Sequence, residues 1–161
     1  MKKSLAMAFF ALLSVVPPAF AAPATPSPLS GRWVLDVDSL AMPAEMRPKS
    51  VSLQFGEMPD GKWNTQVEII DQGGKRMDAQ STLALDGMPA KASGTYWVDV
   101  VAATMPAPSV LVMQFVYEKV PRSTRIYTVS ADGKVLTETE TYFKDDATPM
   151  TRVARFDRIV E

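Results

Sequence analysis

The segment DGKWNTQVEI, residues 60–69, shows the pattern that decides the fold of this 161-residue chain. It opens with Asp60-Gly61, a dipeptide typical of tight hairpin turns because glycine readily adopts the positive φ angle that these turns require. Apolar and polar positions then alternate, with one set at Trp63, Thr65, Val67 and Ile69 and the other at Lys62, Asn64, Gln66 and Glu68. This period of two predicts an antiparallel β-strand with one buried face and one solvated face.

The same alternation recurs on both sides of this segment. It predicts further strands at residues 32–38, 50–55, 76–85, 96–101, 110–117, 124–130, 135–144 and 150–160. Additional turn signals are Asp86-Gly87, Asp132-Gly133 and Asp71-Gln72-Gly73-Gly74. Only residues 39–46 are a helical candidate, and Pro43 interrupts them, so one irregular turn is expected there.

About nine short strands joined by tight turns indicate an all-β domain. Such a meander protects its edge strands either by closing into a barrel or by stacking two sheets. We predict a single antiparallel up-and-down β-barrel of about 8–10 strands over residues 30–161, with a β-sandwich as the alternative.

The N-terminal 21 residues have the features of a secretory signal peptide. Lys2 and Lys3 precede a short apolar run at residues 5–16, and Ala19-Phe20-Ala21 provides a small-residue cleavage site. The apolar run is too short to span a bilayer as a helix. We therefore expect cleavage after Ala21, a flexible Ala/Pro-rich tether at residues 22–29, and a periplasmic or secreted protein with no membrane span.

The composition excludes several kinds of chemistry. The chain has no cysteine and no histidine, so it cannot form a Ser-His-Asp triad, a cysteine nucleophile or a Cys/His zinc site. Its 17 basic and 18 acidic residues give no electrostatic reason to expect nucleic acid as a partner. We expect no catalytic residues, no metal site and no cofactor.

The two ends of the predicted barrel suggest a family. Gly31 and Trp33 stand at the entrance to the first strand, and the last strand carries Arg155 and Arg158. Together with the run SADGKVLT at residues 130–137 and the ending Phe156-Asp157-Arg158, this resembles the lipocalin-like, or calycin, pattern of small exported bacterial proteins. The resemblance implies that an arginine covers Trp33 and closes one barrel end. Arg158 is the first candidate and Arg155 the second, because the parity of the last strand is ambiguous.

The resemblance also implies non-covalent binding of a small apolar or amphipathic molecule in a cavity. Aromatic residues of the central strands could line it, although packing in the core is the favoured interpretation because aromatic residues are common in strands; they are Tyr96, Trp97, Phe115, Tyr117 and Tyr127. Charged residues of the C-terminal third, among them Arg125, Arg152, Glu138 and Glu140, are interpreted as a mixed solvated surface.

Two other functions remain open. The strand at residues 110–117 is apolar on both faces at its start, so it could pair with a protein partner or a second copy in a ligandless interaction module. An outer-membrane β-barrel would also alternate and carry a signal peptide, but the chain ends Ile159-Val160-Glu161 without the terminal aromatic residue typical of that class.

Overall fold

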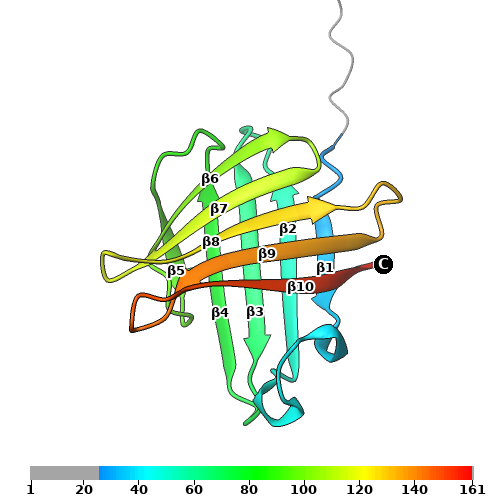
Figure 1. Ribbon diagram of the computed structural model, residues 1–161. Helices are drawn as coiled ribbons and strands as arrows, with labels where there is room; N and C mark the ends of the chain where they lie inside the picture. Colours follow the sequence, from blue (N-terminus) through cyan, green and yellow to red (C-terminus); the bar gives the residue numbers. More distant parts are fainter. Residues whose placement is uncertain (1–25, 161) are drawn as a thin grey trace, which may run out of the picture.

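Ten antiparallel strands follow one another around a closed barrel in the computed structural model, which describes residues 26–160 (Figure 1). The strands are β1 (Gly31–Leu35), β2 (Ser50–Glu57), β3 (Trp63–Ile70), β4 (Arg76–Leu83), β5 (Ala90–Gly94), β6 (Val100–Ala107), β7 (Val110–Tyr117), β8 (Val120–Val129), β9 (Val135–Phe143) and β10 (Pro149–Ile159). Each strand pairs with its neighbours in the chain, and β10 pairs with β1 to close the barrel. The predicted up-and-down barrel is therefore confirmed.

The turn signals connect the expected strands. The segments Asp60-Gly61, Asp86-Gly87 and Asp132-Gly133 join β2 to β3, β4 to β5 and β8 to β9, and all three glycines have positive φ angles. Between β1 and β2 lie two single 3₁₀ turns, η1 (Val37–Ser39) and η2 (Ala44–Met46), instead of a helix. The predicted signal peptide, its cleavage site and the first part of the tether, residues 22–25, lie outside the described residues.

The prediction was wrong between residues 90 and 101. The predicted strand at 96–101 begins only at Val100, and the unpredicted β5 precedes it. The prediction missed β5 because this strand lacks a strong apolar alternation: Lys91 and Ser93 are polar and Ala92 is small. Gly94 ends β5 with φ +135°, and a Cβ atom there would clash with the backbone of Asp78 on β4. A position without a side chain thus lets the two backbones approach closely.

Side chains fill the interior of the barrel. Its largest fully buried residues include Trp33, Trp63, Tyr127, Leu111 and Leu136. The Tyr127 ring meets Phe55 edge-on, with 5.2 Å between centroids. An apolar hollow lined by residues of β3 to β7 and of the β5–β6 loop measures only about 10 Å³, which is the scale of one water-sized probe. The centre of the barrel is therefore a packed core.

Arg158 closes the barrel at the end where the chain enters β1. Its Cζ atom lies 4.0 Å from the centroid of the Trp33 ring, within the range of a cation–π contact. Its Nη1 donates to the Ser30 carbonyl at 2.8 Å, and a Cβ atom on Gly31 would lie 2.5 Å from that nitrogen. Arg155 instead contacts Asp157 at 3.3 Å and is exposed.

The opposite end of the barrel, here called the mouth, is formed by the β5–β6 loop and by the β7–β8 and β9–β10 turns, and these two turns lie close together at the left of Figure 1. The outer face of β7 is partly covered: Val110, Val112 and Val116 are half-buried, whereas Gln114 is exposed. Within residues 26–160, no helix combines the length and apolar character needed to cross a bilayer.

Candidate functional site

A cavity of about 470 Å³ opens at the mouth. Residues from the β5–β6 loop and from strands β7 to β10 surround it: Tyr96, Trp97, Phe115, Val120, Pro121, Arg122, Ser123, Arg125, Glu140, Tyr142, Phe143, Lys144, Asp145 and Arg152. This volume falls in the range of small-molecule sites. The mouth is therefore the best candidate for a functional site among the described residues.

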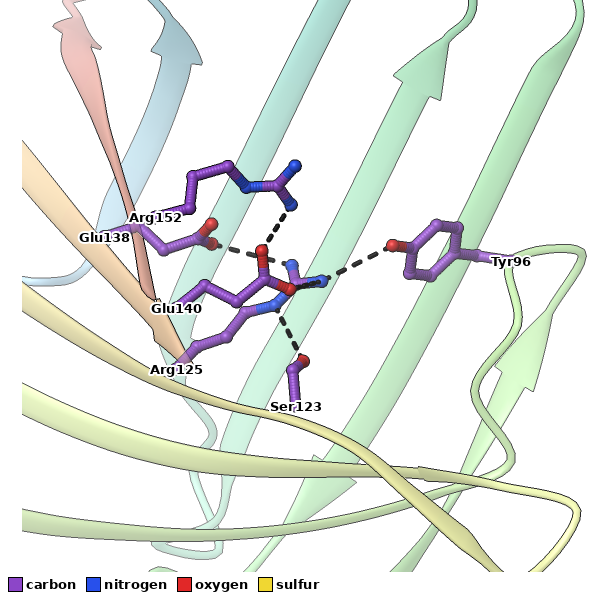
Figure 2. A network of polar contacts seen from close by, with 6 residues as sticks. All are labelled: Tyr96, Ser123, Arg125, Glu138, Glu140 and Arg152. Carbon is purple, nitrogen blue, oxygen red and sulfur yellow. Dashed lines mark hydrogen bonds and ion pairs between the residues drawn. The ribbon is translucent and has the colours of Figure 1, made fainter. Parts of the chain in front are cut away.

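Strand register builds the floor of this cavity. Glu140 on β9 is paired directly with Arg125 on β8 and with Arg152 on β10. Its Oε1 atom lies 3.0 Å from Arg125 Nη2, and its Oε2 atom accepts a hydrogen bond from Arg152 Nη2. Arg125 Nη1 also lies 3.6 Å from Glu138 Oε2. Figure 2 shows this row of alternating charges.

The network corrects the interpretation of these residues as a solvated surface. Arg125, Glu138 and Glu140 are all buried inside the barrel, and only Arg152 is half-exposed. They point inward because they share the strand parity of core residues, Arg125 with Tyr127 and the two glutamates with Leu136. Two arginines and two carboxylates balance in charge, which makes their burial tolerable.

Burial changes the acid–base properties of two members of this row. Desolvation alone would lower the pKa of Arg125, but the neighbouring Tyr127, Glu138 and Glu140 raise it well above its ordinary value. Burial, reinforced by the charge of Glu138, raises the pKa of Tyr127 well above 10. At neutral pH, Arg125 is therefore a permanent cation and Tyr127 a neutral phenol.

Two hydroxyl groups complete the floor. Arg125 Nε donates to Ser123 Oγ at 3.4 Å, and Arg125 Nη2 donates to the Tyr96 hydroxyl at the same distance. Figure 2 shows Tyr96 reaching this guanidinium from the opposite side of the mouth. The Arg125 guanidinium also lies 4.7 Å from the centroid of the Phe115 ring. One buried arginine thus organises the floor of the cavity.

Exposed apolar side chains line the cavity beside the exposed charged residues Arg122, Lys144 and Asp145. Trp97, Val120 and Phe143 are 57%, 52% and 67% exposed, although all three line the cavity. Trp97 lies in the β5–β6 loop, Val120 begins β8 and Phe143 ends β9. Large apolar side chains exposed together around a cavity mark a binding surface more often than isolated ones do.

The structure brings three of the five predicted ligand-binding residues together. Tyr96, Trp97 and Phe115 line the mouth cavity. Tyr117 lies next to it, in a shallower hollow that shares Trp97. Tyr127 lies in the packed core and is 1% exposed. The prediction placed all five on strands, but Tyr96 and Trp97 reach the site from a loop.

The charged half of the site was missed by the prediction. Its members are Arg122, Arg125, Glu140, Lys144, Asp145 and Arg152. For Arg125 and Glu140 the strand parity was a usable signal, because each alternates with residues that are clearly apolar. The pairing of Arg125 with Glu140 depends on strand register, which the sequence pattern does not fix.

The residues of the mouth suit hydrogen bonding and stacking rather than metal binding. Within residues 26–160, no group of three or more His, Cys, Asp or Glu side chains is arranged to hold a metal ion. The Glu140 carboxylate already contacts two arginines. The arrangement offers a charged, hydrogen-bonding floor beneath exposed apolar side chains.

A closed ten-stranded antiparallel barrel is compatible with the lipocalin-like resemblance. Comparisons of the chain with protein-family models, curated proteins and solved structures found no match. Function is therefore inferred from the residues of the mouth.

Proposed function

We propose that this protein binds a small amphipathic molecule non-covalently in the mouth cavity. The observation that carries the proposal is the separation of polarity across the cavity. Arg125, Glu140 and the hydroxyls of Tyr96 and Ser123 form its floor. A ligand with a polar group and an apolar body would satisfy both the floor and the exposed apolar side chains.

The packed core favours an amphipathic ligand over a wholly apolar one. The apolar hollow over the core, lined by residues such as Val67, Val101 and Phe115, measures about 10 Å³, too small for any organic ligand. The larger space is lined by ionised side chains, and a hydrocarbon placed against them would remove their water without replacing its hydrogen bonds. The polar group of the ligand therefore belongs at the floor.

Binding without catalysis is part of the proposal. The chain lacks histidine and cysteine, the side chains that most often act as proton shuttle and thiol nucleophile. The best-placed carboxylate, Glu140, contacts Arg125 through one oxygen and Arg152 through the other, so neither oxygen is free to act on a substrate. A screen with hydrolase substrates that gave turnover would contradict this part.

We also propose that the protein works in the periplasm or outside the cell. The signal-like features of residues 1–21 support export. The outward face of β2 to β4 is rich in polar side chains such as Gln54, Gln66 and Gln80, which favours an aqueous surrounding over the lipid-facing apolar band of a membrane barrel. An N-terminus beginning at Ala22 in the periplasmic extract is the expected result, and recovery of the protein in washed outer membranes would contradict it.

Native mass spectrometry of the exported protein tests the binding function. We expect a co-purifying small molecule, or an adduct with an added neutral amphiphile such as 2-naphthamide. A Trp97→Ala, Phe143→Ser double variant should lose the adduct, because it removes two apolar walls of the mouth. The matched control is Met88→Ser, which changes a 65% exposed apolar residue that does not line the mouth. The absence of any adduct in the native protein, or equal loss in the control, would refute the proposal.

A further inference from the structure

The acceptor atoms of the mouth floor are already engaged. Glu140 Oε1 contacts Arg125 at 3.0 Å, and Glu140 Oε2 accepts from Arg152. Glu138 faces Arg125 and interacts with the Tyr127 hydroxyl, which contributes to the raised pKa of that phenol. A ligand that donates hydrogen bonds would have to compete with these charged contacts, which are stronger than ordinary hydrogen bonds.

The donors of the floor, in contrast, retain free capacity. Ser123 Oγ and the Tyr96 hydroxyl each accept a hydrogen bond from Arg125, and neither donates its own proton to any residue of 26–160. Arg152 uses only Nη2, so its Nε and Nη1 groups have no hydrogen-bond partner in the described part of the chain. Its side chain is 44% exposed and lines the cavity. Hydroxyl and guanidinium donors thus remain for an incoming acceptor.

The charge of the residues that line the cavity also favours a ligand group that accepts hydrogen bonds. Four cations line the cavity, Arg122, Arg125, Lys144 and Arg152, against the two carboxylates Glu140 and Asp145. Neither Arg122 nor Lys144 forms an ion pair with a carboxylate within 4.0 Å among residues 26–160. Glu138 lies behind the floor against Arg125, and Glu118 lies in the adjoining hollow. The lining is positive although the whole chain has a net charge of −1.

We infer that the ligand is an amphipathic organic anion, a carboxylate or a phosphate ester attached to an apolar body. The inference rests on the proposed binding function and specifies its ligand class. The acid group is bound by Tyr96, Ser123 and Arg152, whose free donors match acceptor oxygens, and is attracted by Arg122 and Lys144. The apolar body lies against the Phe115 ring and the exposed apolar side chains, where aromatic surface contributes most of the contact area.

A series of naphthalene compounds with different polar groups tests the inference by calorimetry. The probes are 2-naphthoate, 2-naphthyl phosphate, neutral 2-naphthamide and cationic 2-naphthylmethylammonium. We expect at least one of the two anions to bind ten-fold or more tightly than the amide, since hydrogen bonds to a charged group contribute more than neutral ones. The cation should bind more weakly than the amide. The tighter of the two anions then distinguishes a carboxylate ligand from a phosphate ligand.

Two arginines of β10 provide a matched pair of variants. Arg152→Met removes a donor that faces the cavity, and Arg155→Met removes one that contacts only Asp157 outside it. We expect Arg152→Met to weaken binding of the preferred anion at least five-fold while leaving the amide unchanged, and Arg155→Met to change neither. Tyr96→Phe, which removes only a hydroxyl, is the second variant should Arg152→Met fail to fold.

The possible failures are distinguishable. If the amide or the cation binds as tightly as both anions, the anion inference is wrong and the proposed binding function stands. If Arg155→Met weakens anion binding as much as Arg152→Met does, the assignment of the acid group to the floor is wrong. If no naphthalene compound binds and no adduct co-purifies, both proposals are wrong.

Discussion

The buried charge network of the mouth makes a quantitative prediction for the variant Arg125→Met. Arg125 contacts Glu140 at 3.0 Å and Glu138 at 3.6 Å, and all three side chains are at most 10% exposed. Methionine has a similar length and keeps an apolar contact with Phe115, on which the guanidinium now lies. The substitution therefore removes the positive charge with little change in packing.

The expected loss of stability follows from the charges that stay in the barrel after Arg125 is replaced. Glu140 keeps Arg152, but Glu138 is left with no cation within 4.0 Å among the described residues. Removing one partner of a buried ion pair costs about 3–5 kcal/mol, because the other charge stays buried without compensation. We expect the free energy of unfolding to fall by that amount. This is a large part of the about 5–15 kcal/mol that stabilises an ordinary domain.

Urea unfolding monitored by circular dichroism measures this loss, and two further variants test its cause. Arg152→Met should cost about 1 kcal/mol or less, because that side chain is half-exposed and its removal leaves Glu140 paired with Arg125. The triple variant Arg125→Met, Glu138→Met, Glu140→Met should recover at least half of the loss, since it removes the unpaired charges as well. The part of the stability that is not recovered reflects the loss of Glu138 as a partner of the Tyr127 hydroxyl.

Two results would refute this account of the network. A loss below about 1 kcal/mol for Arg125→Met would mean that water reaches the carboxylates freely, in which case the pair behaves like a surface ion pair. A triple variant no more stable than the single one would mean that the guanidinium acts through packing rather than charge.

Three further predictions concern the core and the entry end of the barrel. Since burial raises the pKa of Tyr127 well above 10, the unfolded chain releases this proton first, so stability should fall above pH 10 by up to about 1.4 kcal/mol per pH unit; Tyr127→Phe should make that decline shallower in pH-dependent urea unfolding, and an unchanged slope would contradict the assignment. Gly31→Ala should cost about 1–3 kcal/mol because of its φ of +131° and the nearby Arg158, whereas Gly56→Ala, with open space around it, should be neutral or slightly stabilising in the same assay; equal effects would argue against a special conformation at Gly31. Leu111→Ala, at a fully buried position, should cost about 2–5 kcal/mol in thermal or urea unfolding, and a cost below 1 kcal/mol would contradict a packed interior.

Much of the barrel was predictable because the responsible signals are local. The alternation from Trp63 to Ile69 and the turn at Asp60-Gly61 correspond to β3 and to the β2–β3 hairpin. These features depend on backbone geometry over a few residues, since side chains in a strand alternate between two faces and glycine tolerates a positive φ angle. β5 escaped prediction because it is held by backbone approach at Gly94 rather than by apolar side chains.

The site was predicted only in its aromatic half. Phe115 was recognisable as an apolar strand residue. Trp97 was predicted as a ligand-binding residue on a strand, and it lines the cavity from a loop instead. Arg125 and Glu140 were interpreted as solvated because charged residues are mostly exposed. Each of the two can be buried only because it pairs with the other. They are 15 residues apart in the chain, and the β8–β9 register brings them together.

The sequence by itself determined an all-β chain with inward apolar faces, tight glycine turns and a Gly-x-Trp entrance to the first strand. Only the tertiary structure decided that β10 closes on β1, that Arg158 rather than Arg155 covers Trp33, and that Glu140 lies between Arg125 and Arg152. The physical reason is the range of the interactions. Periodicity and turn preferences act between neighbours in the chain, whereas a buried charge is stable only when closure of the barrel brings its counter-charge within contact distance.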